Sequence, residues 1–158
     1  MRIVVVGATG NIGTALLREI ASRSSVTSVD AVSRRGPGRL PGPEGVVQIR
    51  HHELDLDCAA DAPAAAALAD LAQGADAVVH LAWTTGRNAR DVTASNKAIS
   101  RNVAAAAARA HQFVVGSCAS VYAASFGEAP RSETWPATGI EGSSLSQDKV
   151  GLDQLSAE

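Results

Sequence analysis

The chain has 158 residues, 46% of them hydrophobic, and this length predicts a single domain over residues 1–158 with a substantial core. Its 14 basic and 16 acidic residues nearly balance, so there is no field to attract nucleic acid or an anionic membrane, and a small-molecule partner is favoured. Two cysteines, Cys58 and Cys118, are too few for a secreted disulfide framework, and neither a signal peptide nor a membrane-spanning run is recognisable, so we expect a cytoplasmic protein.

Short apolar runs alternate with helix-like segments along the whole chain. In chain order we predict strand Arg2–Val6, helix Asn11–Arg23, strand Thr27–Ser33, strand Val46–Leu54, helix Ala60–Gln73, strand Ala77–Ala82, helix Ala89–Ala110, strand Gln112–Cys118 and a last helix from about Ser144. Such alternation, with continuous apolar strands, predicts an α/β fold in which a parallel sheet is covered on both faces. Right-handed crossovers then place a ligand at the carboxyl ends of the strands.

The segment Ile3–Gly13, IVVVGATGNIG, carries the clearest functional signal, because it joins a buried strand to a helix through three glycines. Gly7 allows a tight turn, Gly10 lets the backbone approach phosphates, and Gly13 lets the helix pack close to the strand. A pyrophosphate would then lie at the helix N-terminus. The alternative is a tight turn without a ligand. The other predicted contacts at this turn are Thr9, Asn11 and Ile12, and the apolar face of the helix is predicted at Ile12, Leu16 and Ile20.

The second strand ends in AVSRRG, so Ser33 stands where a carboxylate would hold the ribose hydroxyls of NAD. Arg34 and Arg35 follow, and arginine suits a 2′-phosphate through charge-assisted hydrogen bonds. We therefore favour NADP over NAD, although Arg35 could equally be a solvated loop residue. Asp30 is a rival ribose acid, but it lies three residues before the predicted strand end.

The next two strand ends supply further candidates for the same cleft. Asp55 and Leu56 follow the third strand, where they could meet an adenine, although an ordinary strand-end turn is an alternative. At the end of the fourth strand the predicted cleft residues are Leu81 and Ala82, and after it Trp83, Thr84 and Thr85. His80 lies within an apolar run and is predicted to pack in the core. The other histidines lack metal-ligand spacing, so we predict no metal site.

The chain resembles the extended short-chain dehydrogenase/reductases, specifically the NAD-dependent epimerase/dehydratase family. The matching segments are GATGNIG at 7–13, LDLD around Asp55, HLAW at 80–83, Asn96, FVVGSCASVYA at 113–123, SETWP ending at Pro136, and Lys149. The resemblance implies a Rossmann-like, doubly wound parallel sheet of about five strands. It also implies an enzyme that oxidises a substrate hydroxyl, commonly on a nucleotide-linked sugar, with hydride passing to the nicotinamide.

The family's catalytic group is a serine, a tyrosine and a lysine four residues after the tyrosine. Lys149 matches the lysine, which also binds the nicotinamide ribose, but the tyrosine position is Leu145, which has no ionisable group. Impaired proton transfer is therefore expected. The serine position is Cys118; its thiol would be reactive as a thiolate near Lys149, but we expect a buried strand residue without a catalytic role. Tyr122 is expected to pack.

Two further departures bear on function. The turn in ARAHQFVV is shorter than in relatives, so the helix must end early or the strand start late. The chain also ends at Glu158, before the family's C-terminal substrate region. We therefore expect an exposed fifth strand and a last helix that exposes Val150, Leu152 and Leu155, and with them self-association, marginal stability or a completing partner chain. Three hypotheses remain: an NADP-dependent oxidoreductase or epimerase-like enzyme, a non-catalytic NADP-binding module or sensor, and a degenerate, truncated relic.

Overall fold

The computed structural model describes residues 1–158 except 37–46, 58–62, 87, 126, 128–129 and 158. Within the described residues, parallel strands form one sheet in the order β3-β2-β1-β4-β5. The strands are β1 (Arg2–Val6), β2 (Ser28–Ser33), β3 (Gln48–Glu53), β4 (Ala77–His80) and β5 (Phe113–Val115). The predicted five-stranded, Rossmann-like doubly wound sheet is confirmed.

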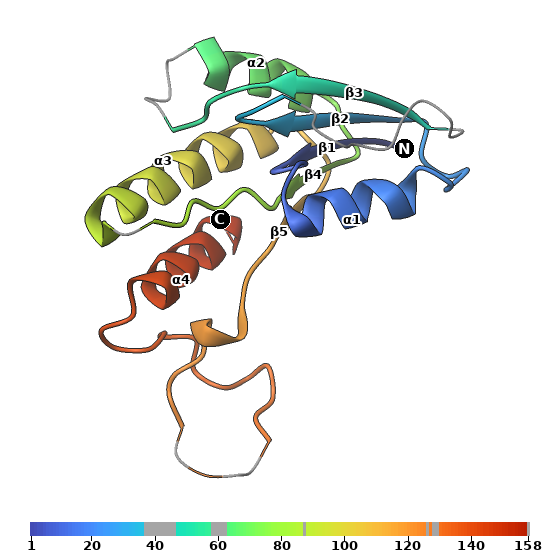
Figure 1. The fold of residues 1–158 in the computed structure, drawn as a ribbon. Helices are drawn as coiled ribbons and strands as arrows, with labels where there is room; N and C mark the ends of the chain where they lie inside the picture. Colours follow the sequence, from blue (N-terminus) through green and yellow to red (C-terminus); the bar gives the residue numbers. More distant parts are fainter. Residues whose placement is uncertain (37–46, 58–62, 87, 126, 128–129, 158) are drawn as a thin grey trace.

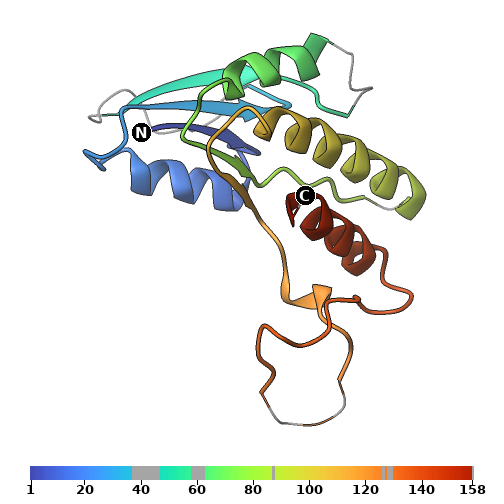
Figure 2. The same cartoon turned by 180° about the vertical axis from the view of Figure 1, so that it is seen from behind.

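Helices cover both faces of this sheet (Figures 1 and 2). They are α1 (Asn11–Ile20), α2 (Pro63–Ala72), α3 (Ala89–Ala107) and α4 (Ser144–Ala157), with a short 3₁₀ helix η1 (Ala119–Val121). Figure 1 shows α1 on one face, with α2 and α3 on the other. Helix α4 packs against α3 and lies near β5, and the segment between η1 and α4 extends away from the sheet.

The core has two halves, one on each face of the sheet, because successive side chains of a strand point to opposite faces. On the α1 face, Val5 and Val29 pack with Leu17 and Ile20. On the other face, the core combines strand valines with apolar side chains of α2 and α3, including Val4, Val6, Val32, Leu68 and Val103. All six residues of β2 are buried, as expected for a strand covered on both sides.

The buried side of α1 differs from the prediction. Gly13, Leu17 and Ile20 are buried, whereas Ile12 is 67% exposed and Leu16 is only partly buried. The helix must present Gly13 to the turn before it, and this contact sets the rotation of the helix about its axis. Positions 13, 17 and 20 share one face at helical spacing, so Leu17 takes the place predicted for Leu16.

Several elements are shorter than predicted. Helix α1 ends at Ile20 rather than Arg23, and α3 ends at Ala107 rather than Ala110, so that a turn fits before β5. β4 and β5 end at His80 and Val115, the last residue pair of their ladder, rather than at Ala82 and Cys118. β2 starts one residue later than predicted and β3 ends one residue earlier, at Glu53. The predicted starts of the third strand, at Val46, and of the second helix, at residues 60–62, lie outside the described residues.

The last helix begins at Ser144, as predicted. Leu152 is buried, so the expectation that it would be exposed is wrong; the contact between α3 and α4 explains its burial. Val150 and Leu155 are half-buried. β5 lies at the edge of the described sheet, as expected, and its Val114 is 41% exposed.

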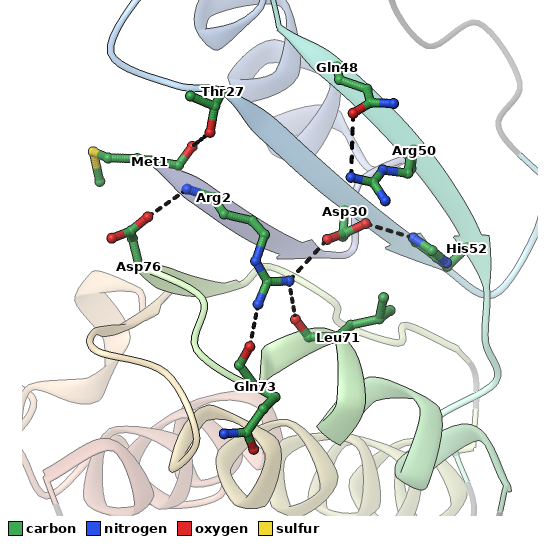
Figure 3. A network of polar contacts seen from close by, with 10 residues as sticks. All are labelled: Met1, Arg2, Thr27, Asp30, Gln48, Arg50, His52, Leu71, Gln73 and Asp76. Atoms are coloured by element: carbon green, nitrogen blue, oxygen red, sulfur yellow. Dashed lines mark hydrogen bonds and ion pairs between the residues drawn. The ribbon is translucent and has the colours of Figure 1, made fainter.

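A polar network crosses the sheet from β1 to β3 and centres on Asp30 (Figure 3). The Asp30 carboxylate is 3% exposed, lies 2.9 Å from His52 Nε2 and is 3.4 Å from Arg2 Nη1. The Arg2 guanidinium also donates to the carbonyls of Leu71, at 2.7 Å, and Gln73, at the end of α2. Asp30 therefore joins β1, β2 and β3 within the sheet, and it is not available as a ribose ligand.

We predict that Asp30→Ala lowers the free energy of unfolding by about 2 kcal/mol, because it leaves Arg2 and His52 without their shared carboxylate. Urea denaturation followed by circular dichroism measures the loss. The matched control is Asp70→Ala, which removes an exposed carboxylate 4.0 Å from Arg109. This control should change stability by less than about 0.5 kcal/mol. Equal effects of the two substitutions would contradict a structural role for the network.

Candidate functional site

The turn between β1 and α1 depends on two glycines, Gly7 and Gly13, that no other residue could replace without displacing backbone. Gly7 has φ +91°, and a Cβ there would lie 2.5 Å from the backbone nitrogen of Ala82. The Gly7 and Ala8 N–H groups both donate to the Val32 carbonyl, at 2.9 and 3.1 Å. The turn is therefore held between the ends of β2 and β4.

Gly13 and Gly10 differ in how much room they have. A Cβ at Gly13 would lie 2.3 Å from the Gly7 carbonyl oxygen, so this glycine is required for the close approach of α1 to the turn. A Cβ at Gly10 would meet only the same oxygen, at 3.3 Å, among atoms within 4 Å. Gly10 is therefore less constrained than Gly7 and Gly13: a Cβ there would press on one backbone oxygen, which would have to give by a few tenths of an ångström.

A cleft of about 270 Å³ opens at the carboxyl ends of β1 to β4. The chain runs outward from β1 in both directions across the sheet, so this is the point at which the strand order switches. The residues that line it are Val6, Gly7, Thr9, Gly10, Val32, Ser33, Arg34, Arg35, Leu54, Asp55, Leu56, Leu81, Ala82, Trp83, Thr84 and Ile99. Most of the residues predicted for the cofactor lie in this one cleft.

One end of the cleft is polar and carries both arginines. Arg34 and Arg35 follow β2 directly, and Ser33 is the last residue of that strand. Asp55 and Leu56 line the same cleft after β3, and the Leu56 carbonyl accepts a hydrogen bond of 2.9 Å from Asn102 Nδ2 of α3. The strand-end residues are thus brought together as predicted from the topology.

Trp83 connects the cleft to Lys149. The Lys149 Nζ lies 3.8 Å from the centroid of the Trp83 ring and donates to the Gly116 carbonyl at 2.5 Å. Lys149 is 9% exposed, and burial lowers the pKa of its ammonium, while Cys118 and Asp153 act to raise it. Lys149 does not itself line the cleft, and the Trp83 ring is its contact with that space.

A buried asparagine fixes the segment after β4. The Asn96 side chain accepts from the Thr84 N–H at 2.8 Å and donates to the Thr84 carbonyl at 3.1 Å. Asn96 lies in α3 and is almost fully buried. This reciprocal pair satisfies both backbone groups of Thr84 and holds Trp83 and Thr84 at the rim of the cleft.

The positions matched to the family's tyrosine and serine lie near Lys149. Leu145 is 49% exposed, one helical turn before Lys149 in α4. Cys118 is partly exposed and directly precedes η1, with its Sγ 2.9 Å from Ser120 Oγ, so the prediction that it lies buried in a strand is wrong. The ladder of β5 ends at Val115, which leaves Cys118 in the loop that follows. Tyr122 lies in a separate groove beside Trp135.

Asn11, Ile12 and Gly13 were predicted at the pyrophosphate but do not line the cleft, and Thr85 does not line it either. Asn11 and Ile12 are exposed to solvent. Gly13 is where α1 packs against the backbone of Gly7 and Ala8. Four residues that line the cleft were not predicted from the sequence. Three of them lie one or two positions from a predicted residue, and the fourth lies in α3. These are Val6, Val32, Leu54 and Ile99. The first three could have been predicted from their positions at or next to the ends of strands.

His80 is the last residue of β4, and its side chain is buried in the core, as predicted. Its Nε2 lies 3.3 Å from Ser100 Oγ, and its Nδ1 has no hydrogen-bond partner within the described part of the chain. Burial, assisted by the charge of Lys149, lowers the pKa of His80 to about 4. The ring is therefore neutral at pH 7, which suits a core residue.

The described ranges contain neither a metal-binding cluster nor a membrane-spanning helix. No cluster of three or more histidine, cysteine, aspartate or glutamate side chains there could hold a metal ion. Likewise, none of the helices in these ranges combines the length and apolar character needed to cross a bilayer. Cys58 lies outside the described residues.

Solved structures of similar fold span about twice the length of this chain. The Bordetella bronchiseptica enzyme WbmH, in complex with NAD+, is 20% identical with a TM-score of 0.74 and is matched over 99% of this chain and 51% of that one. A UDP-glucuronic acid 4-epimerase from Bacillus cereus, in complex with NAD, is 22% identical with a TM-score of 0.72 over 98% and 51%. A mutated uronate dehydrogenase is 23% identical with a TM-score of 0.68 over 98% and 52%.

Sequence comparison finds similarity to a curated protein and to a family model. The hybrid PKS-NRPS synthetase poxE of Penicillium oxalicum is 34% identical over 80 residues, which are 51% of this chain but 2% of that protein. The family model of the NAD dependent epimerase/dehydratase family matches residues 3–142. Since this match covers most of the chain and both the glycine turn and the cleft, the chain belongs to the NAD dependent epimerase/dehydratase family.

Proposed function

We propose that this chain binds a nicotinamide dinucleotide in the cleft at the carboxyl ends of β1 to β4, with NADP(H) favoured over NAD(H). The observation that carries the proposal is the meeting of Gly7, Thr9 and Gly10 with residues of three other strand ends around one cleft. The pyrophosphate would lie against the glycine turn, where Gly10 lines the cleft without a side chain. The adenosine would extend toward Asp55 and Leu56, and the nicotinamide toward Leu81, Ala82 and Trp83.

The preference for NADP rests on charge at the end of β2. Ser33 provides no carboxylate for the ribose hydroxyls, and Asp30 is engaged by Arg2 and His52. Arg34 and Arg35 are the cations nearest to this end of the cleft among its lining residues. Several similar structures are NAD complexes, including those of WbmH and the Bacillus cereus epimerase. A 2′-phosphate would nevertheless gain charge-assisted hydrogen bonds from the arginines of this chain.

The chemical role that we propose is that of an oxidoreductase or epimerase that acts on a nucleotide-linked sugar. The bound cofactor would supply the hydride chemistry. One similar structure, MoeE5, is a complex with UDP-glucuronic acid and NAD, which supports this substrate class. This chain spans about half the length of such proteins. A further segment, a second copy or a partner chain would complete the substrate side, and the cytoplasm is the proposed compartment.

Catalysis by this chain is proposed to be impaired, because position 145 lacks an ionisable group. Lys149 is in place beside Trp83, where it could hold the nicotinamide ribose, and Cys118 offers a thiol nearby. The second candidate function is therefore a non-catalytic dinucleotide-binding module or sensor, and a degenerate relic is the third. The exposed Leu145 favours these alternatives over an active enzyme.

Calorimetric titration of the purified chain with NADPH and NADH, combined with thermal melts, tests the binding proposal. A ligand that binds only the native state must raise the melting temperature. Saturable binding with a preference for NADPH would support the proposal. A folded chain that binds neither nucleotide would favour the relic.

We predict that Gly10→Val weakens dinucleotide binding at least about tenfold, or about 1.4 kcal/mol, because a side chain would occupy the space for the pyrophosphate. Gly10 lines the cleft, but its new Cβ would lie 3.3 Å from the Gly7 carbonyl oxygen, so we expect a small fall in the melting temperature without ligand beside the loss of affinity. Calorimetry and a thermal melt of the same sample separate the two effects. Unchanged affinity in the folded variant would remove the glycine turn from the site.

We predict that Arg34→Ala weakens NADPH binding about tenfold or more, while NADH binding changes by less than about twofold, because only NADPH carries the 2′-phosphate. Titrations with both nucleotides measure the ratio of the two dissociation constants. Arg18→Ala, at an exposed position in the last turn of α1, is the matched control for general charge. Equal losses for both nucleotides would mean that Arg34 contributes charge without selectivity.

We predict that the phenol introduced by Leu145→Tyr titrates about one pH unit below its usual value near 10, because Lys149 lies one helical turn away. Ultraviolet titration measures it, and the wild-type chain, with Tyr122 as its single tyrosine, supplies the baseline. Position 145 is exposed, so the larger ring has room. An ordinary titration would show that the lysine does not face this position.

A further inference from the structure

The hydroxyl of Ser33 links two segments that meet at the polar end of the cleft. Its Oγ donates to the Arg35 carbonyl at 2.5 Å and lies 2.8 Å from His51 Nε2. A hydroxyl has a single hydrogen, and a carbonyl oxygen can only accept. The hydrogen therefore goes to Arg35, and His51 Nε2 must be the donor to Ser33.

The protonation of His51 agrees with this arrangement. Burial, with a contribution from His52, lowers the pKa of His51, whereas Glu53 acts to raise it. The ring is therefore neutral at pH 7 and carries one N–H, which the contact with Ser33 places on Nε2. Protonation in acid would leave this hydrogen bond intact, since both ring nitrogens then donate.

The strand register explains why His51 rather than His52 reaches Ser33. β2 and β3 are parallel, with His51 beside Ala31 and Glu53 beside Ser33. Neighbouring side chains of β3 point to opposite faces of the sheet, so His52 reaches Asp30 on the other face. His51 and Ser33 thus share one face at the end of the two strands.

We propose that His51 is a positioning residue for cofactor selectivity: through Ser33 it fixes the turn that carries Arg34 and Arg35, and so prepares both arginines for the 2′-phosphate of NADP(H). The inference rests on the proposed preference for NADP. An ordered turn loses less conformational entropy when it binds, so its contacts contribute more to affinity. NAD(H) has no 2′-phosphate and gains nothing from this order.

The surrounding charge makes the position of the arginines important. The Glu53 carboxylate is near the turn, because a Cβ at Gly36 would lie 3.8 Å from Glu53 Oε2. This negative charge opposes a phosphate in the same region. Arg34 and Arg35 both line the cleft. Their positive charges offset the negative charge of Glu53 most effectively when the backbone that carries them is fixed.

Three variants of β3 test the inference by titration with NADPH and NADH at neutral pH. His51→Phe keeps a ring but removes the donor, and His51→Gln keeps a side-chain N–H. His52→Phe is the matched control, because it changes the neighbouring residue on the other face and breaks the contact with Asp30. We expect His51→Phe to weaken NADPH binding about three- to tenfold with NADH binding unchanged, and His51→Gln to restore most of the preference.

The outcomes separate this inference from the proposed function. If Arg34→Ala loses the preference for NADPH while the folded His51→Phe variant keeps it, His51 has no positioning role and the proposed preference stands. If the wild-type chain shows no preference for NADPH, the proposed cofactor choice fails and the inference fails with it. An equal change in His51→Phe and His52→Phe would also overturn the inference, since both would then act through general stability. Thermal melts confirm that each variant is folded.

Discussion

Gly7 and Gly13 bring the backbones of β1, α1 and the end of β4 closer together than any side chain allows. A Cβ at Gly7 would overlap the backbone of Ala82, and one at Gly13 would overlap the Gly7 carbonyl. These two contacts fix where α1 begins, how it is rotated, and where the chain leaves β4. The rotation buries Leu17 and Ile20, which form one half of the core. Packing and the geometry of the cleft therefore depend on the same constraint.

The cleft follows from this constraint and from the parallel sheet. Because β2 and β4 flank β1, the segments after these strands emerge side by side, and Gly7 adds no side chain between the turn and the end of β4. Long-range hydrogen bonds then hold each emerging segment in place. Asn96 binds both backbone groups of Thr84, and Asn102 binds the Leu56 carbonyl. Helix α3 thus supports the side of the cleft opposite to α1, and loop residues become a defined surface.

Sequence patterns predicted those features that depend on residues close together in the chain. The end of β2 and the exposure of Arg34 to the cleft follow from an apolar run followed by charged residues. Periodicity could not choose between Leu16 and Leu17, because the Gly13 contact sets the rotation of α1. Cys118 continued an apolar run, but β4 offers no partner beyond His80, so the strand ends before it. The contact between His51 and Ser33 depends on register between strands, which one sequence does not reveal.

The two ends of the cleft differ in how completely they are built. At the β2 end, backbone turns, arginines and supporting hydrogen bonds are all present in one ordered arrangement. At the β4 end, Lys149 retains its place between Trp83 and Gly116, yet position 145 offers an exposed leucine where proton transfer needs an ionisable group. Under the proposed function, nucleotide affinity would depend on the first end and reaction rate on the second. Under the same proposal, such a chain would bind its ligand without catalysing a reaction, because the groups proposed to hold the adenosine half do not depend on the residue at position 145.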